Sequence, residues 1–390
     1  MDVGALSLSP IGRLVRISGR DARYGEDYEA WAYVPDPLPS TVDLTSDALL
    51  AVVDATGALA RLDQASARLP NLPMFVRPAV RQEAISTSAL EGTYATMDQL
   101  LEVDVLEERQ VSAAVAEVNN YVRATEVAFD WVRERPITVG LLESLHSILV
   151  RGTQADTADA GRVRTSQVFI GAPGVRVSEA RFVPPPPGDQ LRADLIAWAD
   201  WVEATDRLPT LVKVALAHYQ FETLHPFNDG NGRLGRLVCV LQMVRRGDLR
   251  VPILSLSPWL EAHRTEYQDH LFNVSATGDF NPWIEFLCQG VSVQARKGIE
   301  KIDALYDWRE ATLARLREER IKGVAVQIAE DLIGYPMITP TLAARRYGVT
   351  YPAANTAIRV LTEHGILEER SGRRHGRVFA ANEVIGIINH

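Results

Sequence analysis

The spacing of apolar and polar residues predicts a mainly helical protein. From residue 46 onward apolar side chains recur at helical intervals, beginning with Leu49, Val53, Ala60 and Leu62. The same pattern predicts further helices over residues 78–91, 98–132, 189–204, 209–224, 233–246, 258–272 and 281–317. No apolar run approaches the ~18 residues that a transmembrane helix requires, so we expect no membrane-spanning segment.

Two segments interrupt the helical pattern. Residues 1–39 are rich in proline, glycine and aromatic residues without sustained periodicity, which predicts an arm that lies on another part of the protein. Residues 162–187 carry branched and aromatic residues on both sides of a glycine and proline turn, which predicts a β-hairpin. Four prolines over residues 184–187 then predict a stiff exit from this hairpin.

The end of the chain has the pattern of a separate small domain. Helices are predicted over residues 324–332, 339–347 and 351–364, and a two-stranded hairpin over residues 365–380. Helix, helix, turn, helix and hairpin is the order of a winged helix-turn-helix domain.

Composition narrows the class of protein. A length of 390 residues indicates two or three folded units, and the net charge of −9 argues against a chain that coats nucleic acid through bulk charge. Cys239 and Cys288 lie far apart in apolar surroundings, which is typical of a reduced protein without disulfides or cysteine metal sites. The first ten residues lack the features of a signal peptide, so we expect a cytoplasmic protein.

The run from His225 to Arg236, HPFNDGNGRLGR, concentrates chemistry suited to phosphate. Gly230, Asn231 and Gly232 form a turn that opens a helix, where free backbone N–H groups and the helix dipole favour an anion. Arg233 and Arg236 are three residues apart on that helix, so both guanidinium groups can bind phosphate oxygens.

Two further residues of this run are candidates for catalysis. Asp229 offers a hard oxygen ligand beside the phosphate turn, as Mg²⁺ requires. His225 ends the preceding helix, and an imidazole can act as a general base near neutral pH. Nucleophilic attack on a phosphate depends on positioning of the reactants and on neutralisation of phosphate charge. The run from His225 to Arg236 could supply both.

This run resembles the HPFx[DE]GNGRxxR motif of the Fic (filamentation induced by cAMP) family at every fixed position. The resemblance implies a mainly α fold: a helical Fic core with a β-hairpin flap, to which the C-terminal winged helix-turn-helix domain is added. The domains it suggests are an N-terminal arm with regulatory helices (1–110), a catalytic core (111–300), a connecting helix (301–323) and the winged helix (324–390).

The resemblance also implies an activity: transfer of AMP from ATP to a Ser, Thr or Tyr hydroxyl of a protein, including the protein itself. His225 would then deprotonate the target hydroxyl, and Asp229 would hold Mg²⁺. The residues implied for ATP are Gly230, Asn231, Gly232, Arg233, Arg236 and, as an aromatic lining of the nucleoside pocket, Tyr267.

Residues 83–96 resemble the regulatory segment of the family, and Thr87 to Gly92 fit its [ST]xxxE[GN] inhibitory motif. The resemblance implies that Glu91 pairs with Arg236 and blocks the γ-phosphate, with Thr87 as the hydroxyl of the motif. An arginine bound to a carboxylate is unavailable to phosphate, and the carboxylate itself repels phosphate.

The flap is expected to align the target side chain by strand addition, through Val175, Arg176 and Val177. The winged helix is more basic than the rest of the chain: residues 339–380 contain seven arginines against three glutamates, a net +4. Arg373, Arg374 and Arg377 would lie at its wing, where they could contact DNA phosphates. A protein contact or a homodimer is an equal alternative.

Other functions stay open at this level. A protein of this family could transfer another phosphate-containing group, or remove AMP from a modified protein. A DNA-binding regulator whose Fic core senses a nucleotide is a third alternative, from a different class.

Overall fold

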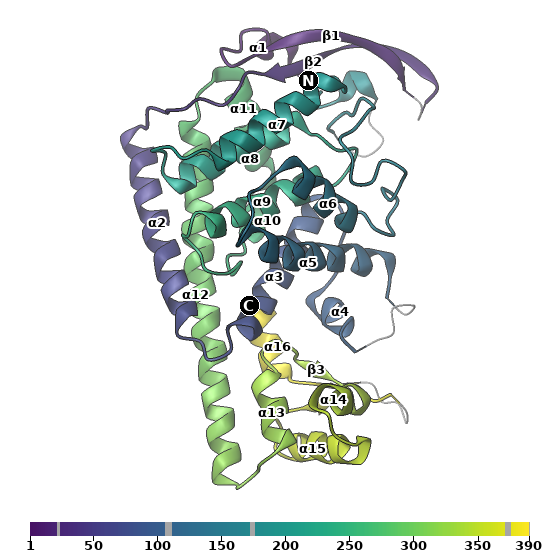
Figure 1. Cartoon of the computed structure of the whole chain (residues 1–390), viewed down its shortest axis with the longest axis vertical. Coiled ribbons are helices and arrows are strands. Elements are labelled where there is room, and N and C mark those ends of the chain that lie inside the picture. Colours follow the sequence, from purple (N-terminus) through teal and green to yellow (C-terminus); the bar gives the residue numbers. More distant parts are fainter. Residues whose placement is uncertain (22–23, 106–110, 172–175, 371–375, 390) are drawn as a thin grey trace.

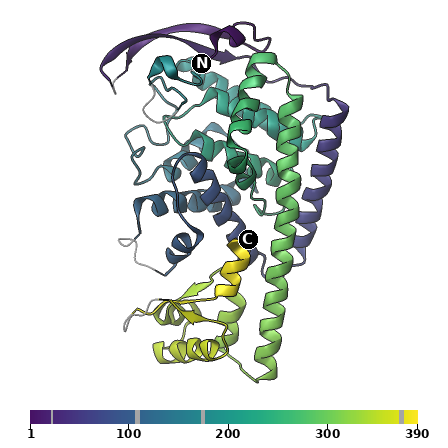
Figure 2. The same cartoon turned by 180° about the vertical axis from the view of Figure 1, so that it is seen from behind.

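The computed structural model describes residues 1–21, 24–105, 111–171, 176–370 and 376–389. A helical body occupies one end, a smaller C-terminal unit occupies the other, and the helix α12 runs along both (Figure 1). Figure 2 shows from behind that α2 lies alongside α12. Among the described residues no helix is long and apolar enough to cross a membrane.

The elements follow the chain in a simple order. The N-terminal elements are α1 (Val3–Leu6), β1 (Gly12–Asp21), β2 (Glu26–Pro35), α2 (Ser46–Ala67), α3 (Leu72–Leu90) and α4 (Met97–Glu102). The body continues with α5 (Ala113–Val132), α6 (Val139–Leu149), the 3₁₀ turn η2 (Val177–Glu179), α7 (Asp189–Glu203), α8 (Thr210–Leu224), α9 (Asn231–Arg245), α10 (Ser257–Ala262), α11 (Arg264–Thr277) and α12 (Asn281–Glu318). The C-terminal unit contains α13 (Val324–Asp331), β3 (Met337–Ile338), α14 (Pro340–Tyr347), α15 (Tyr351–Glu363), β4 (Glu368–Glu369), β5 (Phe379–Ala380) and α16 (Asn382–Asn389).

Helices α8 and α9 form the centre of the body. Almost every side chain of both helices is buried, as expected for helices that have apolar neighbours on all sides. One apolar core packs α8 against α2 and α12, and a second packs α8 and α9 against α5, α6 and α7. The loop between α8 and α9 is therefore held at both ends by the most buried elements of the protein.

Residues 1–39, predicted as an arm, contain regular structure that the sequence pattern did not indicate. Strands β1 and β2 form an antiparallel hairpin, paired from Gly12 opposite Pro35 to Asp21 opposite Glu26. The hairpin does lie on another segment, as expected: the Tyr33 N–H donates to the Val183 carbonyl at 2.9 Å, and the Tyr28 ring contacts the Phe169 ring.

The hairpin expected over residues 162–187 is much shorter than predicted. A single antiparallel bridge joins Ile170 to Phe182, and the 3₁₀ turn η2 stands where the second strand was expected. Val175 lies outside the described residues. The segment pairs with itself around Ile170 and also contacts β2, through the Tyr33–Val183 backbone hydrogen bond and the Tyr28–Phe169 ring contact.

Two of the long predicted helices are divided. Residues 98–132 contain α4 and α5 with a break between them, and residues 258–272 contain α10 and α11, which meet at His263. The predicted helix over residues 281–317 is one continuous helix of 38 residues, α12.

The C-terminal unit contains a strand that the pattern did not indicate. Strand β5 pairs with β4 as predicted for a hairpin, but it also pairs with β3, so the sheet order is β3-β5-β4. The short α16 then returns toward the body, and Lys301 of α12 donates to the Ile388 carbonyl at 2.9 Å. The apolar core of this unit includes Phe75 of α3 and Leu101 of α4, so it packs against the helices of the body.

Candidate active site

The loop between α8 and α9 is built by backbone conformations that few residues adopt. His225 ends α8 in the left-handed region with φ 47°, and Gly230 precedes α9 with φ 73°. Asn231 closes the loop, because its side-chain carbonyl accepts from the Phe227 N–H and its amide donates to the Phe227 carbonyl. The strained geometry at His225 is characteristic of functional sites.

Arg164 holds the beginning of this loop, a role that the sequence did not reveal. Its buried guanidinium donates to the His225 carbonyl at 2.8 Å and to the Pro185 carbonyl at 2.6 Å. The Arg164 N–H also donates to the Pro226 carbonyl. One buried cation therefore joins the end of α8, the loop and the proline run.

A second buried residue supports the other side of the loop. The His146 ring stacks on the Phe227 ring with centroids 4.2 Å apart, and its Nε2 lies 3.0 Å from the Asp229 carbonyl. Its Nδ1 accepts from the Gly161 N–H, so Nε2 carries the proton and donates to Asp229. Burial lowers the pKa of His146, which agrees with a neutral ring in this position.

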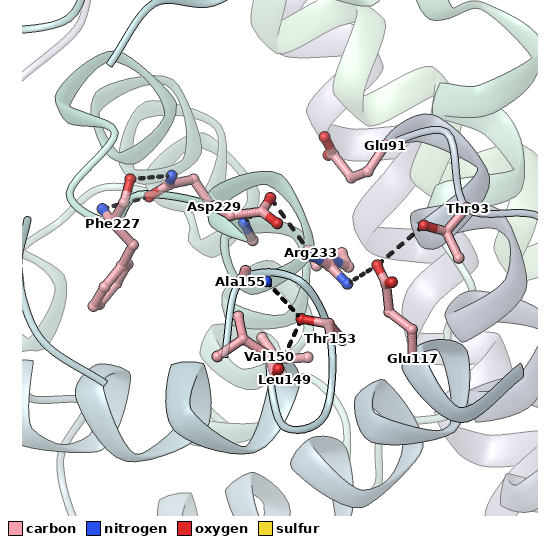
Figure 3. Close-up of polar contacts among 12 residues, drawn as sticks. Glu91, Thr93, Glu117, Leu149, Val150, Thr153, Ala155, Phe227, Asp229 and Arg233 are labelled. Atoms are coloured by element: carbon pink, nitrogen blue, oxygen red, sulfur yellow. Dashed lines mark hydrogen bonds and ion pairs between the residues drawn. The ribbon is translucent and has the colours of Figure 1, made fainter. Parts of the chain in front are cut away.

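The start of α9 is an anion site by its construction. The first backbone N–H groups of a helix have no intrahelical partner, and the helix dipole makes this end positive. Arg233 is buried beside it and donates to Glu117 at 2.5 Å, which also accepts from Thr93 (Figure 3). The Asp229 side chain, more than half exposed, lies 3.7 Å from Arg233.

Arg236, one turn further along α9, donates hydrogen bonds to the end of α3 through its Nε and Nη2. Its Nε donates to the Thr87 hydroxyl at 2.7 Å, and its Nη2 donates to the Thr87 carbonyl and to Glu91 Oε1 at 2.5 Å. A Cβ built on Gly232 would lie 2.0 Å from the same Glu91 oxygen. The Glu91 carboxylate therefore covers the first turn of α9.

The charges of this pair are strongly coupled. Burial raises the pKa of Glu91, but the Arg236 guanidinium outweighs burial and holds that pKa below its ordinary value. Burial likewise lowers the pKa of Arg236, and Glu91 outweighs it, so the pKa of Arg236 is raised. Both residues are ionised at neutral pH.

His225 lies in a setting suited to a neutral base. Burial, with a smaller effect of the Arg164 guanidinium, lowers the pKa of His225 to about 4. The ring is therefore uncharged over the physiological range, with a nitrogen lone pair available to accept a proton. Its Nδ1 lies 3.3 Å from the Glu222 carbonyl.

A layer of buried polar residues beneath Arg236 was also missed. Burial raises the pKa of Glu222 to about 7, and burial raises the pKa of Glu83 to the same value. Glu83 accepts from the Ser257 N–H at 2.8 Å, whereas Glu222 Oε1 is buried without a hydrogen-bond partner among the described residues. Such residues are hard to identify from sequence because single glutamates in helices usually face solvent.

Five of the candidate residues border one cavity of about 200 Å³, whereas Thr87, Asp229, Gly230, Asn231 and Arg233 lie outside its lining. Glu91, Gly232, Arg236 and His225 line one side, and Tyr267 of α11 lines another. The Tyr267 ring is buried, and its hydroxyl lies 2.7 Å from His218 Nε2. Ile170 and Phe182 of the bridged segment close the rim.

The remaining predicted residues lie at the margin. Arg176 is exposed and pairs with Glu26 of β2 at 3.3 Å, and Val177 is buried in η2, so neither lies on a strand as expected. Within the described ranges, no group of three or more histidine, cysteine or acidic side chains could hold a metal ion.

Comparison with known proteins agrees with this geometry. Residues 49–130 match the N-terminal model of the Fic/DOC family, and residues 136–243 match the Fic/DOC family model itself. Over these residues the chain is similar to the Fic/DOC family. The second match contains the whole α8–α9 loop, and the first contains Thr87 and Glu91.

Among curated relatives, the protein adenylyltransferase fic-1 of Caenorhabditis elegans is 36% identical over 138 residues, which are 35% of this chain and 24% of that protein. The protein adenylyltransferase Fic of Nematostella vectensis is 28% identical over 233 residues, 56% of this chain and 49% of that protein. The chain thus spans half or less of the length of these relatives.

A solved structure shows the same fold. The crystal structure of a Fic family protein from Desulfovibrio desulfuricans G20 superposes with a TM-score of 0.55 at 21% identity. The superposition covers 88% of this chain and 98% of the other.

Proposed function

We propose that this protein is an autoinhibited protein adenylyltransferase, which transfers AMP from ATP to a Ser, Thr or Tyr hydroxyl of a protein target. The observation that carries the proposal is the Glu91 carboxylate on Arg236 at the first turn of α9. An internal anion lies at the site that a nucleotide phosphate would need, beside a neutral histidine. The matched relatives named protein adenylyltransferases support this class of reaction.

Each residue has a role that follows from its place. Asn231 and Gly232 bind the phosphates through backbone N–H groups, because α9 begins there. Gly230 supplies the left-handed turn before α9, and its own N–H donates to Asp229 Oδ1 at 2.6 Å. Arg233 and Arg236 neutralise phosphate charge, once Arg236 is released by Glu91 and Thr87. Neutral His225 removes the proton of the target hydroxyl as that oxygen bonds to the α-phosphorus and pyrophosphate leaves.

Mg²⁺ fits the donor set beside the phosphate site. Protein sites for Mg²⁺ in phosphoryl transfer commonly use one or two carboxylates, with phosphate oxygens and water completing the shell. Asp229 offers one such carboxylate, more than half exposed and adjacent to the start of α9. Among the described residues no larger group of acidic side chains surrounds Asp229. We therefore propose that Mg²⁺ binds together with ATP, whose phosphate oxygens would supply the other ligands. When bound, the ion would neutralise phosphate charge.

Tyr267, Ile170 and Phe182 line the part of the cavity away from α9, and we assign this part to the nucleoside. The target segment would then approach along the bridged segment, which lines the cavity through Ile170, Gly171, Arg181 and Phe182. Arg176 and Val177 stand between these residues in the sequence and are proposed as part of the docking surface outside the cavity lining. Val175 is proposed for the same docking surface on sequence grounds alone.

For the C-terminal unit we propose a winged helix that docks proteins rather than DNA. The sheet order β3-β5-β4, with α14 and α15 between β3 and β4, supports the winged-helix interpretation. Three arginines of this unit are paired: Arg359 with Glu363, Arg370 with Asp98, and Arg377 with Asn355. Arg346 stacks on the Tyr335 ring, and Arg345 is exposed on α14. Arg373 and Arg374 lie outside the described residues. Electrophoretic retention of duplex DNA by the full chain at physiological salt would contradict this proposal.

The type of reaction is tested with ATP labelled in either the α- or the γ-phosphate, given to the Glu91→Gly protein in the presence of Mg²⁺. Label retained on protein only from the α position is the expected result. Retention only from the γ position would indicate a kinase and contradict the proposal. The matched control is the double variant Glu91→Gly with His225→Ala, which should retain neither label while still binding ATP.

A further inference from the structure

A second cavity, of about 480 Å³, lies away from the candidate active site. Its walls come from the first half of α3, from α5, from the loop after α9 and from Tyr335 at the edge of the C-terminal unit. These elements meet where the helical body contacts the C-terminal unit (Figure 1). Its volume lies within the range of small-molecule sites, roughly 300–1,000 Å³.

The lining of this cavity is mainly apolar. Val76 and Val80 of α3 face Val122 and Phe129 of α5, and Pro252 adds a further apolar surface. A cavity with such walls favours an occupant that has an aromatic or acyl body, since burial of apolar surface is the main source of affinity there.

The charged groups at the cavity are predominantly guanidinium groups. Arg133 is exposed at the rim over the Phe129 ring, and no acidic side chain of the described residues pairs with it. Arg77 stacks on Tyr335 at 4.2 Å, and its Nε is buried without a hydrogen-bond partner among the described residues. Its ion pairs are long, 3.6 Å to Asp104 and 3.7 Å to Glu126.

Glu126 is the acidic residue that lines the cavity itself, and its side chain is 60% exposed. The other guanidinium groups of the lining are already neutralised, Arg250 by Asp63 and Arg81 by Asp104. The Arg133 guanidinium has no acidic partner among the described residues, and Arg77 has only long ion pairs and an Nε without a hydrogen-bond partner among them. These two residues therefore favour an occupant with a negative charge.

We propose that this cavity is a binding site for a small amphipathic organic anion, an aromatic or acyl carboxylate or sulfonate, whose acidic group binds Arg133 and Arg77. Nothing in the proposed adenylyl transfer uses these residues. The site is distinct from the nucleotide cavity, which shares no lining residue with it.

The site has a route to the active site through α3. The first half of this helix forms the cavity wall, and its last turn presents Thr87 and Glu91 to Arg236. An occupant that fills the space between α3, α5 and Tyr335 holds α3 in this position. This part of the inference rests on the proposed function and predicts that occupation strengthens inhibition by Glu91.

Binding is tested with 8-anilinonaphthalene-1-sulfonate as probe, by calorimetric titration of the full chain. We expect one saturable site, weaker binding of the uncharged analogue N-phenyl-1-naphthylamine, and loss of the site in Val122→Trp, which fills the cavity. Arg133→Gln should weaken binding about three- to five-fold, as expected for one partly exposed charge pair. Arg13→Gln, an exposed arginine on β1, is the matched control and should bind as wild type.

Equal binding by Arg133→Gln and Arg13→Gln would overturn the proposal, as would unchanged binding by a folded Val122→Trp. Since Arg133 is exposed, its substitution leaves the core intact and decides the question even where the tryptophan variant does not fold. The link to α3 is tested separately by calorimetric titration with Mg·ATP. Because Glu91 occupies Arg236, the probe should weaken Mg·ATP binding by wild type and leave binding by Glu91→Gly unchanged. If the probe binds the cavity but affects wild type and Glu91→Gly equally, the binding site stands and the proposed link between the cavity and Glu91 is refuted.

Discussion

At the scale of single residues, the sequence motifs predicted the contact between Glu91 and Arg236. They did not predict the buried residues Arg164 and His146, which hold the α8–α9 loop. Thr87, Glu91 and Arg236 are brought together by hydrogen bonds, although 145 residues separate the last two. Arg164 and His146 were not predicted, because their partners are backbone carbonyls that reach them only after the helices pack. A buried arginine or histidine has no local pattern that distinguishes it from an exposed one.

Asp229→Ala should weaken the binding of Mg·ATP, because this exposed carboxylate is the ligand that we propose for Mg²⁺ beside the phosphate site. Calorimetric titration with ATP, with and without Mg²⁺, measures the effect, and the affinity for ATP alone should change little. Equal affinity of wild type and variant for Mg·ATP would place the metal elsewhere.

Glu222→Gln should change how stability depends on pH. Burial raises the pKa of Glu222 from its ordinary 4.5 to about 7 in the folded protein, so the folded state favours the uncharged form. The contribution of Glu222 to the free energy of unfolding is fully present below pH 4.5. As the pH rises through about 7, up to about 3 kcal/mol of this free energy is lost.

The free energy of unfolding of Glu222→Gln minus that of wild type should therefore increase from pH 5 to pH 8. Urea unfolding of both proteins at the two pH values measures this difference. Glu29→Gln, on the exposed face of β2, is the control and should leave the pH dependence unchanged. A difference between Glu222→Gln and wild type that does not grow with pH would contradict this assignment.

At the scale of elements, helices were predicted well and strands poorly. The helices α8, α9 and α12 lie within a few residues of their predicted bounds, because their apolar periodicity extends over many turns. The β1–β2 hairpin was missed because it depends on distant partners: Ala32 packs with Ala180 and Val183 in a small separate core. An isolated hairpin is marginal in water, so its sequence carries a weak local pattern.

Arg164→Gln should destabilise the α8–α9 loop, because the loss of a buried guanidinium leaves the carbonyls of His225 and Pro185 without a donor. We expect a loss of roughly 2–4 kcal/mol in the free energy of unfolding, measured in urea. Arg162→Gln, two residues earlier and exposed, should cost less than about 0.5 kcal/mol. Similar values for the two variants would show that Arg164 does not hold the loop.

At the scale of the whole molecule, the C-terminal unit is tied to α3, the helix whose C-cap is Glu91. Arg81 of α3 donates to the Gly334 carbonyl at 3.0 Å, and a Cβ on Gly334 would lie 2.7 Å from the Met74 sulfur. The sequence predicted this unit as separate from residue 324 onward. It gave no indication of the shared core, because contacts between distant segments have no local pattern.

The full chain should therefore unfold in a single thermal transition, observed alike by far-ultraviolet circular dichroism and by tryptophan fluorescence. Phe75, Leu101 and Ile328 belong to one core, so the C-terminal unit cannot separate without exposing apolar surface of the body. Two well-resolved transitions in calorimetry would contradict this coupling.

The central claim, that Glu91 restrains AMP transfer, is tested most directly by intact-mass spectrometry of the protein after incubation with Mg·ATP. Wild type, Glu91→Gly and Glu91→Gln are compared, since glutamine keeps the size of the side chain and removes the charge that binds Arg236. The account predicts little or no added AMP on wild type, clear addition on Glu91→Gly and an intermediate or equal level on Glu91→Gln. If neither variant carries more AMP than wild type at saturating Mg·ATP, Glu91 does not restrain the reaction.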